Sequence, residues 1–123
     1  MEEDKGSSFR PTQFSGKKED YVMWAAKFLS YAQVKGFKKV LLGTEVVPHS
    51  STVIIESDKE KLRIRKANDM AYSMLNISVN DDVSFGAIFN AVTEKLPDGD
   101  AKMAWDNLKT IFKPVSNAKK HEL

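Results

Sequence analysis

The chain has 123 residues, a formal net charge of +2 and no cysteine. This length suits one domain with a single buried core, and the missing cysteines exclude disulfides, thiol catalysis and Cys-ligated zinc. No apolar run approaches the roughly 20 residues of a membrane span, and Glu2, Glu3 and Asp4 form the wrong flank for a signal peptide. We therefore expect a soluble, cytoplasmic protein with no membrane partner.

Residues 1–12 lack apolar periodicity and are expected to form a flexible arm before a helical domain at 13–114. From Asp20 to Lys35, apolar residues recur at steps of three and four, and Gly36 follows as a helix stop. A short helical turn that ends at Gly43 is expected next. The expected buried face of the first helix consists of Tyr21, Trp24, Phe28, Tyr31 and Ala32.

The segment 44–55 differs from its surroundings because it is rich in β-branched residues and is interrupted by Pro48. We expect a small β-hairpin or an extended loop there, since two strands alone cannot make a fold. A long helix follows, with Ser57 and Glu60 at the spacing of a capping box. Its predicted apolar face runs from Ile64 to Ser78.

Two further helices complete the predicted bundle. The first should be capped by Asn80 and end at Pro97. Its expected buried stripe consists of Phe85, Ile88, Phe89, Val92 and Leu96. The second should run from Ala101 to Phe112 before Pro114, so that residues 115–123 form a linker or the start of a following helical domain. The predicted fold class is all-α, a compact bundle of about four to five helices.

The sequence offers little material for a catalytic, metal or cofactor site, and we predict none of these. His49 and His121 are isolated, without a partner at ligand spacing. The glycines are too scattered for a phosphate-binding loop. The segment 98–100 lacks the alternating oxygen ligands of a calcium loop, so we interpret it as a turn with a helix cap. We therefore expect no enzyme and no small-molecule substrate; an enzyme would need a deep pocket with convergent polar groups.

Two basic groups are candidates for contact with RNA. The first lies near the start of the long helix and consists of Lys59, Lys61, Arg63, Arg65 and Lys66. The second lies near the end of the chain and consists of Lys113, Lys119 and Lys120. Neither is interleaved with aromatic residues that could stack on bases, so a solvated surface is favoured for both. Lys113, Lys119 and Lys120 remain the candidates for a weak RNA contact.

Two tryptophan-containing blocks give the sequence a recognisable order. Near the start, Phe14-Ser15-Gly16 is followed by Tyr21 and Trp24, and Phe28 and Gly36-Phe37 continue the pattern. Near the end stands the block Ala104-Trp105-Asp106-Asn107-Leu108, followed by Phe112. Over residues 14–123 this order resembles the Gag polypeptide of copia-type LTR retrotransposons, with its Phe-x-Gly, Asn-Tyr and Trp signature and its Ala-x-x-Ala-Trp-x-x-Leu block. Two positions differ from the family pattern: Asp20 stands where the family usually has asparagine, and Lys38 stands where a tryptophan is common.

The resemblance implies an N-terminal capsid domain that self-associates into the shell of a virus-like particle around RNA. It also implies a second helical domain beyond this chain, with RNA packaged mainly by regions outside it. No catalytic residue follows from the resemblance, and the family's core positions map onto Trp24, Phe28, Trp105, Leu108 and Phe112.

For the assembly interface we predict the outer side of the first helix, because it leaves apolar area away from the core stripe. Its residues are Val22, Met23, Ala26 and Leu29. The alternative is a helical adaptor domain that binds one protein partner through an exposed groove and forms no large particles. A domesticated Gag could be such an adaptor.

Overall fold

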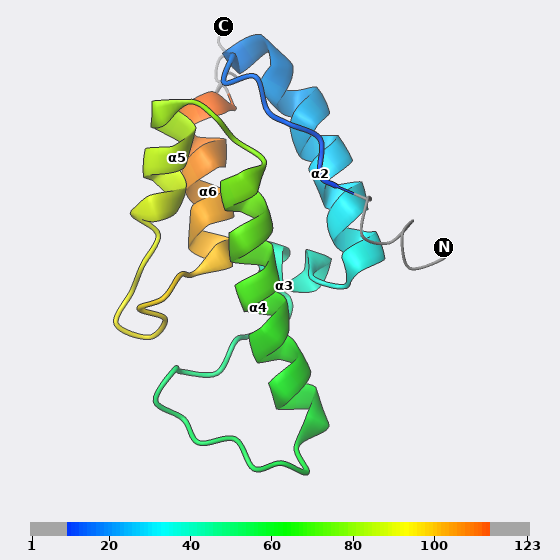
Figure 1. Cartoon of the computed structure of the whole chain (residues 1–123), viewed down its shortest axis with the longest axis vertical. Helices are drawn as coiled ribbons and strands as arrows, with labels where there is room; N and C mark the ends of the chain where they lie inside the picture. Colours follow the sequence, from blue (N-terminus) through cyan, green and yellow to red (C-terminus); the bar gives the residue numbers. More distant parts are fainter. Residues whose placement is uncertain (1–9, 114–123) are drawn as a thin grey trace, which may run out of the picture.

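The computed structural model describes residues 10–113, which form helices joined by loops (Figure 1). A single 3-10 turn, η1 (Lys18–Asp20), leads into the first long helix. The helices are α2 (Tyr21–Lys35), α3 (Lys38–Leu42), α4 (Lys59–Ile77), α5 (Asp82–Phe89) and α6 (Ala101–Phe112). The described residues contain no sheet, and their one isolated bridge pairs Phe14 with Val79. The predicted all-α fold class is confirmed.

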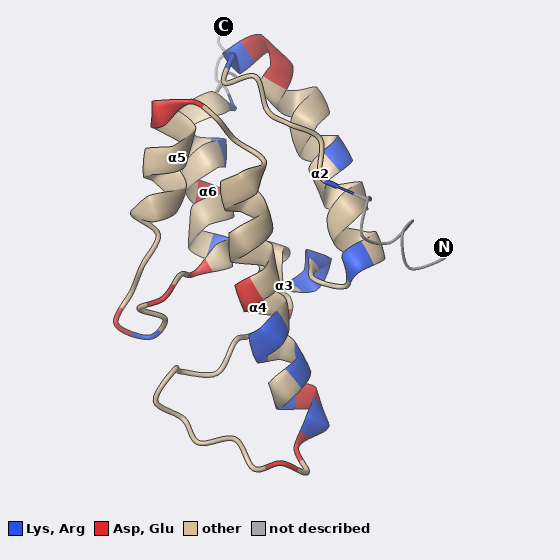
Figure 2. Ribbon diagram, in the orientation of Figure 1, with Lys and Arg blue, Asp and Glu red and all other residues tan. Residues whose placement is uncertain are grey.

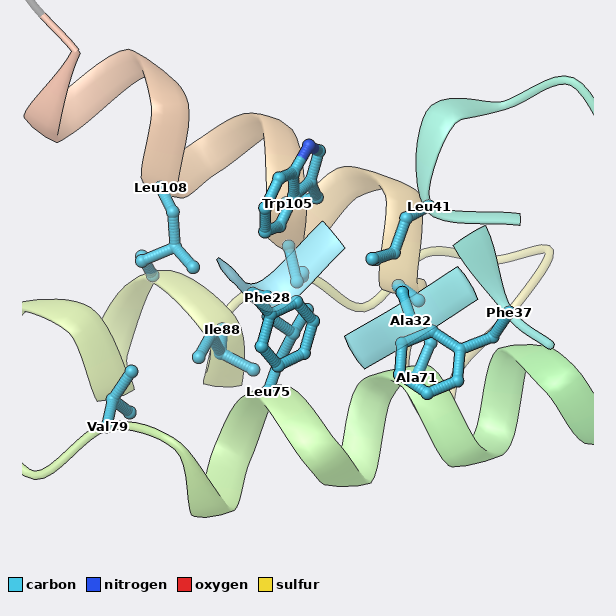
Figure 3. Close-up of a cluster of buried hydrophobic side chains, with 14 of the residues drawn as sticks. Phe28, Ala32, Phe37, Leu41, Ala71, Leu75, Val79, Ile88, Trp105 and Leu108 are labelled. Carbon is cyan, nitrogen blue, oxygen red and sulfur yellow. The ribbon is translucent and has the colours of Figure 1, made fainter. Parts of the chain in front are cut away.

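A continuous cluster of aromatic rings joins the two ends of the described chain. The Phe14 ring lies 4.9 Å from that of Phe112, and the Trp24 ring lies 5.2 Å from that of Phe28. Phe28 in turn stacks on Trp105 at 5.7 Å. Figure 3 shows Phe28 and Trp105 in the middle of the core, among aliphatic side chains of α4, α5 and α6. All five residues predicted as core positions, Trp24, Phe28, Trp105, Leu108 and Phe112, are buried.

A buried amide joins α4 to the start of α6. The Asn68 side chain is 2 % exposed; its Nδ2 donates to the Gly99 carbonyl at 3.0 Å and its Oδ1 accepts from the Ala101 N–H at 3.0 Å. Gly99 has a φ of +133°, and a Cβ placed there would lie 2.5 Å from the Tyr72 ring, so the turn needs glycine. Asp100 accepts from the Met103 N–H at 3.1 Å and caps α6. The segment 98–100 is thus a turn with a helix cap.

Two helix caps differ from those predicted. Asp58, rather than Ser57, caps α4 by accepting from the Lys61 N–H at 3.2 Å. Asp81, rather than Asn80, caps α5 by accepting from the Ser84 N–H at 2.9 Å. In both places the cap is the aspartate one residue further along the chain, because its carboxylate can accept a hydrogen bond from a free N–H group of the first turn. The Asn80 amide instead donates to Gln13 Oε1 at 3.0 Å.

Helix α5 is shorter than predicted, and the predicted buried stripe was wrong for three of its residues. The helix ends at Phe89, because the chain reverses after Asn90 and the Asp100 N–H returns to the Ala91 carbonyl at 2.8 Å. Ile88 and Leu96 are buried, but the exposed residues of the stripe are Phe85 (49 %), Phe89 (64 %) and Val92 (48 %).

The buried face of α5 consists mainly of small residues, Ser84 and Ala87, together with Ile88. Small side chains let the helix approach its neighbours closely, as in other tightly packed helix pairs. Two bonds from neighbouring helices confirm this orientation: Asn107 Nδ2 donates to the Ala87 carbonyl at 3.0 Å, and Tyr72 Oη donates to the Ile88 carbonyl at 2.7 Å.

The segment 44–55 forms an extended loop and no hairpin. Arg65 of α4 holds the loop, because its Nη2 donates to the His49 carbonyl at 2.7 Å and to the Thr52 carbonyl at 3.0 Å. The Ser50 N–H donates to the Lys95 carbonyl at 2.8 Å, which joins the loop to the segment before α6. Side-chain and loop bonds therefore replace the ladder that a hairpin would provide.

The last residues assigned to the N-terminal arm lie against α2. Pro11 is buried, and the Thr12 carbonyl accepts from Trp24 Nε1 at 2.7 Å. The Phe14 N–H donates to the Ser78 carbonyl at 2.8 Å, which fixes the entry of the chain at the end of α4. Residues 1–9 and 115–123, which the sequence assigned to the arm and to a linker, lie outside the described residues.

Candidate functional surfaces

The outer side of α2, predicted as the assembly interface, is exposed in the structure. Val22 is 61 % and Met23 is 65 % exposed, Ala26 is exposed, and Leu29 is half-buried. The opposite face of the same helix contributes Trp24 and Phe28 to the core. A helix with apolar residues on both faces leaves one of them open to a partner.

Three of the four predicted interface residues line a groove of about 270 Å³ between α2 and α6. We call this the α2–α6 groove. Its lining residues are Tyr21, Val22, Ala25, Ala26, Leu29, Leu42, Trp105, Lys109 and Lys113. Met23 does not line it, because its position on α2 is turned away from α6. The groove is thus apolar along α2 and carries Lys109 from the last turn of α6 and Lys113, the residue that follows this helix.

The lining of the α2–α6 groove includes two lysines, Lys109 and Lys113, and no acidic residue. Residues 21–44 contain four lysines and no acidic residue, and Figure 2 shows these positive positions along α2 and α3. Within the part of the chain that the structure describes, neither Lys109 nor Lys113 forms an ion pair. Burial, followed by the nearby charge of Asp106, raises the pKa of Tyr21 to about 12, so its hydroxyl is neutral at physiological pH.

A second exposed apolar surface lies on α5. The rings of Phe85 and Phe89 stack with their centroids 5.9 Å apart and an interplanar angle of 23°. Asp82 lies on the same side of the helix, because positions i, i+3 and i+7 share one face. We call these three residues the α5 aromatic face.

The sequence-based reasoning missed the α5 aromatic face, because large aromatic residues at helical spacing are usually buried. The signal available in the sequence was the opposite stripe of small residues, Ser84 and Ala87, which suits close helix packing. For the groove, the sequence identified the wall on α2 but not Leu42 or Lys109. Their contribution depends on how α3 and α6 pack against α2, which spacing along the chain does not encode.

The basic group on α4 is largely engaged within the protein. Arg63 Nη2 donates to Glu60 at 2.6 Å and pairs with Glu45, and the hydrogen bond from Arg63 lowers the pKa of the Glu60 carboxyl. Arg65 is bonded to the loop carbonyls described above. Of the second basic group, Lys113 lies at the α2–α6 groove, and Lys119 and Lys120 lie outside the described residues.

Of the two histidines, His49 lies within the described residues and has a local structural role, whereas His121 lies outside them. His49 Nδ1 accepts from the Ser51 N–H at 3.1 Å within its own loop. Among residues 10–113, no group of three or more His, Asp or Glu side chains is placed to hold a metal ion. In the same range, every helix is too short or too polar to cross a membrane. A hollow of about 470 Å³ beside α3 is lined by Lys38, Lys39, Glu45, Glu60 and Arg63. Arg63 is hydrogen-bonded to both glutamates, so these three charges are paired with one another.

Residues 10–113 thus form an all-α domain, in which the α2–α6 groove and the α5 aromatic face are separate apolar surfaces. No protein-family model matches the chain, and neither does any curated protein or solved structure. The resemblance to copia-type Gag therefore stays a prediction from the sequence.

Proposed function

We propose that this chain is a structural capsid domain of the Gag type, which self-associates in the cytoplasm into the shell of a virus-like particle around RNA. The observation that carries the proposal is the α2–α6 groove with its apolar wall on α2, in which Val22 and Ala26 are exposed and Leu29 is half-buried. Exposed apolar area of this kind is typical of protein interaction surfaces. The resemblance of the two tryptophan blocks to copia-type Gag indicates that the partner is another copy of the same protein.

The strength of association should depend on what is joined to this domain. A single groove of this size gives a weak contact, so the isolated chain should be a monomer or a weak, concentration-dependent oligomer. When a second self-associating domain follows on the same chain, each later contact forms at high effective concentration. Stable particles are therefore expected from the longer Gag polypeptide and not from this domain alone.

RNA should be held mainly by regions outside this chain. The formal net charge is only +2, and the two arginines of the α4 basic group, Arg63 and Arg65, are bonded to Glu45 and to the 44–55 loop. Because nucleic-acid affinity without base contacts comes from phosphate neutralisation, we expect RNA binding by this domain to be weak and to fall steeply with salt.

The α2–α6 groove also supports a second candidate, a helical adaptor that binds one protein partner. A concave apolar groove beside a helix is a recurring site for an amphipathic partner helix. The two candidates differ in what they form, because an adaptor gives a complex of fixed composition and a capsid domain gives large regular assemblies.

Electron microscopy of the longer Gag polypeptide tests the proposal. We expect regular particles that contain RNA, and treatment with nuclease before and after disruption shows whether the RNA is enclosed. If the protein instead remained in small complexes of fixed stoichiometry at high concentration, the adaptor would be favoured and the proposed function contradicted.

A further inference from the structure

The α5 aromatic face is exposed although the helix itself is firmly held. Phe85 and Phe89 are 49 % and 64 % exposed, while Ser84 and Ile88 on the other side are fully buried. The helix cannot rotate to bury its aromatic rings without exposing Ile88 and breaking the bonds to the Ala87 and Ile88 carbonyls. Two stacked aromatic rings at a fixed position on the surface are therefore available to a partner.

The charge around these rings indicates what kind of partner fits. Residues 76–94 contain Asp81, Asp82 and Glu94 and no basic residue, and Figure 2 marks the start of α5 as acidic. Aromatic platforms that stack on nucleic-acid bases are accompanied by cationic residues that hold the phosphates. An acidic aromatic face is instead suited to an apolar protein surface with a basic edge.

The same chain presents such a surface in the α2–α6 groove. Its wall is apolar, and Lys109 and Lys113 contribute the positive charge. Within the described residues, these lysines and Asp82 lack ion-pair partners. An ion pair between them would therefore form without breaking an existing one. The groove volume of about 270 Å³ is below the roughly 300–1,000 Å³ of small-molecule pockets and suits one or two protein side chains.

We propose that the α5 aromatic face of one copy of this chain docks into the α2–α6 groove of the next copy. The inference rests on the proposed function, because it names the partner of the same groove. The lengths agree: Asp82 and Phe89 are seven residues apart, as are Val22 and Leu29, so each surface extends about 10 Å along its helix. Phe85 and Phe89 contact the apolar wall, and Asp82 faces Lys109 and Lys113.

The position of the two surfaces determines the kind of assembly. In Figure 1, α2 and α5 lie on opposite sides of the molecule, with α4 and α6 between them, so the surfaces of one copy cannot meet. A contact between two different surfaces leaves one free surface at each end, so it continues to further copies until it closes into a ring or extends as a filament. A contact between identical surfaces would instead stop at a dimer. The docking of α5 into the groove thus supplies one repeating contact of a shell, and the second domain of the longer Gag would supply others.

Disulfide trapping tests the contact even if it is weak, because the chain has no cysteine of its own. The two variants Phe89→Cys and Ala26→Cys, each in the 123-residue chain and distinguished by size tags, are mixed under mild oxidation. We expect about tenfold more of the mixed dimer than of either homodimer, against the about twofold excess that random pairing alone gives. The double variant should give a ladder of oligomers.

The matched controls are Val83→Cys on α5 and Val34→Cys on α2. Both positions are exposed, but neither belongs to the α5 aromatic face or lines the groove. All four variants should retain the wild-type circular dichroism spectrum, since they replace exposed side chains. If a variant does not, Phe85→Cys replaces Phe89→Cys, and Val22→Cys replaces Ala26→Cys.

The outcomes separate this inference from the proposed function. Trapping of the mixed pair at the rate of the control pair would overturn the inference, and so would a predominant Phe89→Cys homodimer, which would indicate a contact between two α5 helices. If the longer Gag still formed particles that enclose RNA, the proposed function would stand and only the docking would fail. As a second measurement, Asp82→Lys should reduce the trapping several-fold, and Lys109→Glu with Lys113→Glu in the partner should restore it.

Discussion

Replacement of Trp105 by alanine should remove a large part of the stability of this domain. The Trp105 side chain is 3 % exposed, and its ring lies 5.7 Å from Phe28 and 5.9 Å from Trp24. Truncation of a buried aromatic residue costs about 3–5 kcal/mol through lost transfer free energy and the remaining cavity. Because natural domains have about 5–15 kcal/mol in total, Trp105→Ala should leave the protein marginal or unfolded.

The loss can be measured by urea denaturation followed by circular dichroism, with Met103→Ala as the matched control. Met103 lies on the same helix but is 38 % exposed, so its replacement should change the free energy of unfolding by no more than about 1 kcal/mol. A change within about 0.5 kcal/mol for Trp105→Ala would refute the reasoning, because it would mean that the indole is not part of the packed core.

Three further changes test other features of the structure. Since burial raises the pKa of Tyr21 to about 12, its phenol ionises first in the unfolded chain, and the free energy of unfolding should fall by about 1–2 kcal/mol between pH 10 and 12. In Tyr21→Phe this part of the loss should be absent. Asn68→Ala should cost about 2–4 kcal/mol, because it leaves two buried backbone groups without their partner. Ile88→Ala should cost about 2–5 kcal/mol, whereas Phe89→Ser should cost no more than about 1 kcal/mol. Chemical denaturation measures each of them.

Each of these expectations has a result that would contradict it. An identical loss of stability above pH 10 in Tyr21→Phe and the wild type would show that other groups cause it. An unchanged midpoint for Asn68→Ala would mean that water replaces the amide. A larger cost for Phe89→Ser than for Ile88→Ala would mean that α5 packs with its aromatic face inward, as the sequence alone suggested.

The long amphipathic helices could be predicted from the sequence because their buried faces are marked by large residues. In α2 and α6, the aromatic and aliphatic side chains at steps of three and four are the residues that pack, and Gly36 ends α2 in the left-handed conformation with a φ of 92°. The same reasoning failed for α5, where both faces are apolar over eight residues. Which face of α5 is buried depends on how closely the helix approaches α4 and α6. The small side chains of Ser84 and Ala87 allow this close approach, and the larger Phe85 and Phe89 do not.

The candidate site was only half predictable for a related reason. The wall of Val22, Ala26 and Leu29 follows from the helical period of α2, since these residues lie beside the stripe of Trp24 and Phe28 that packs in the core. The groove, however, needs a second wall, and the sequence does not show that α6 places Lys109 and Lys113 beside α2. Nor does the sequence show that Arg65 of the basic group on α4 is used to hold the loop at His49.

The most direct test of the proposed function is particle assembly by the longer Gag polypeptide carrying Ala26→Glu. Val34→Glu serves as the matched control, because Val34 is 71 % exposed on the same helix and does not line the groove. Both variants should keep wild-type helicity by circular dichroism. Electron microscopy should show normal particles for Val34→Glu and few or none for Ala26→Glu. Normal particles from a normally folded Ala26→Glu protein would contradict the claim that this domain assembles through the α2–α6 groove.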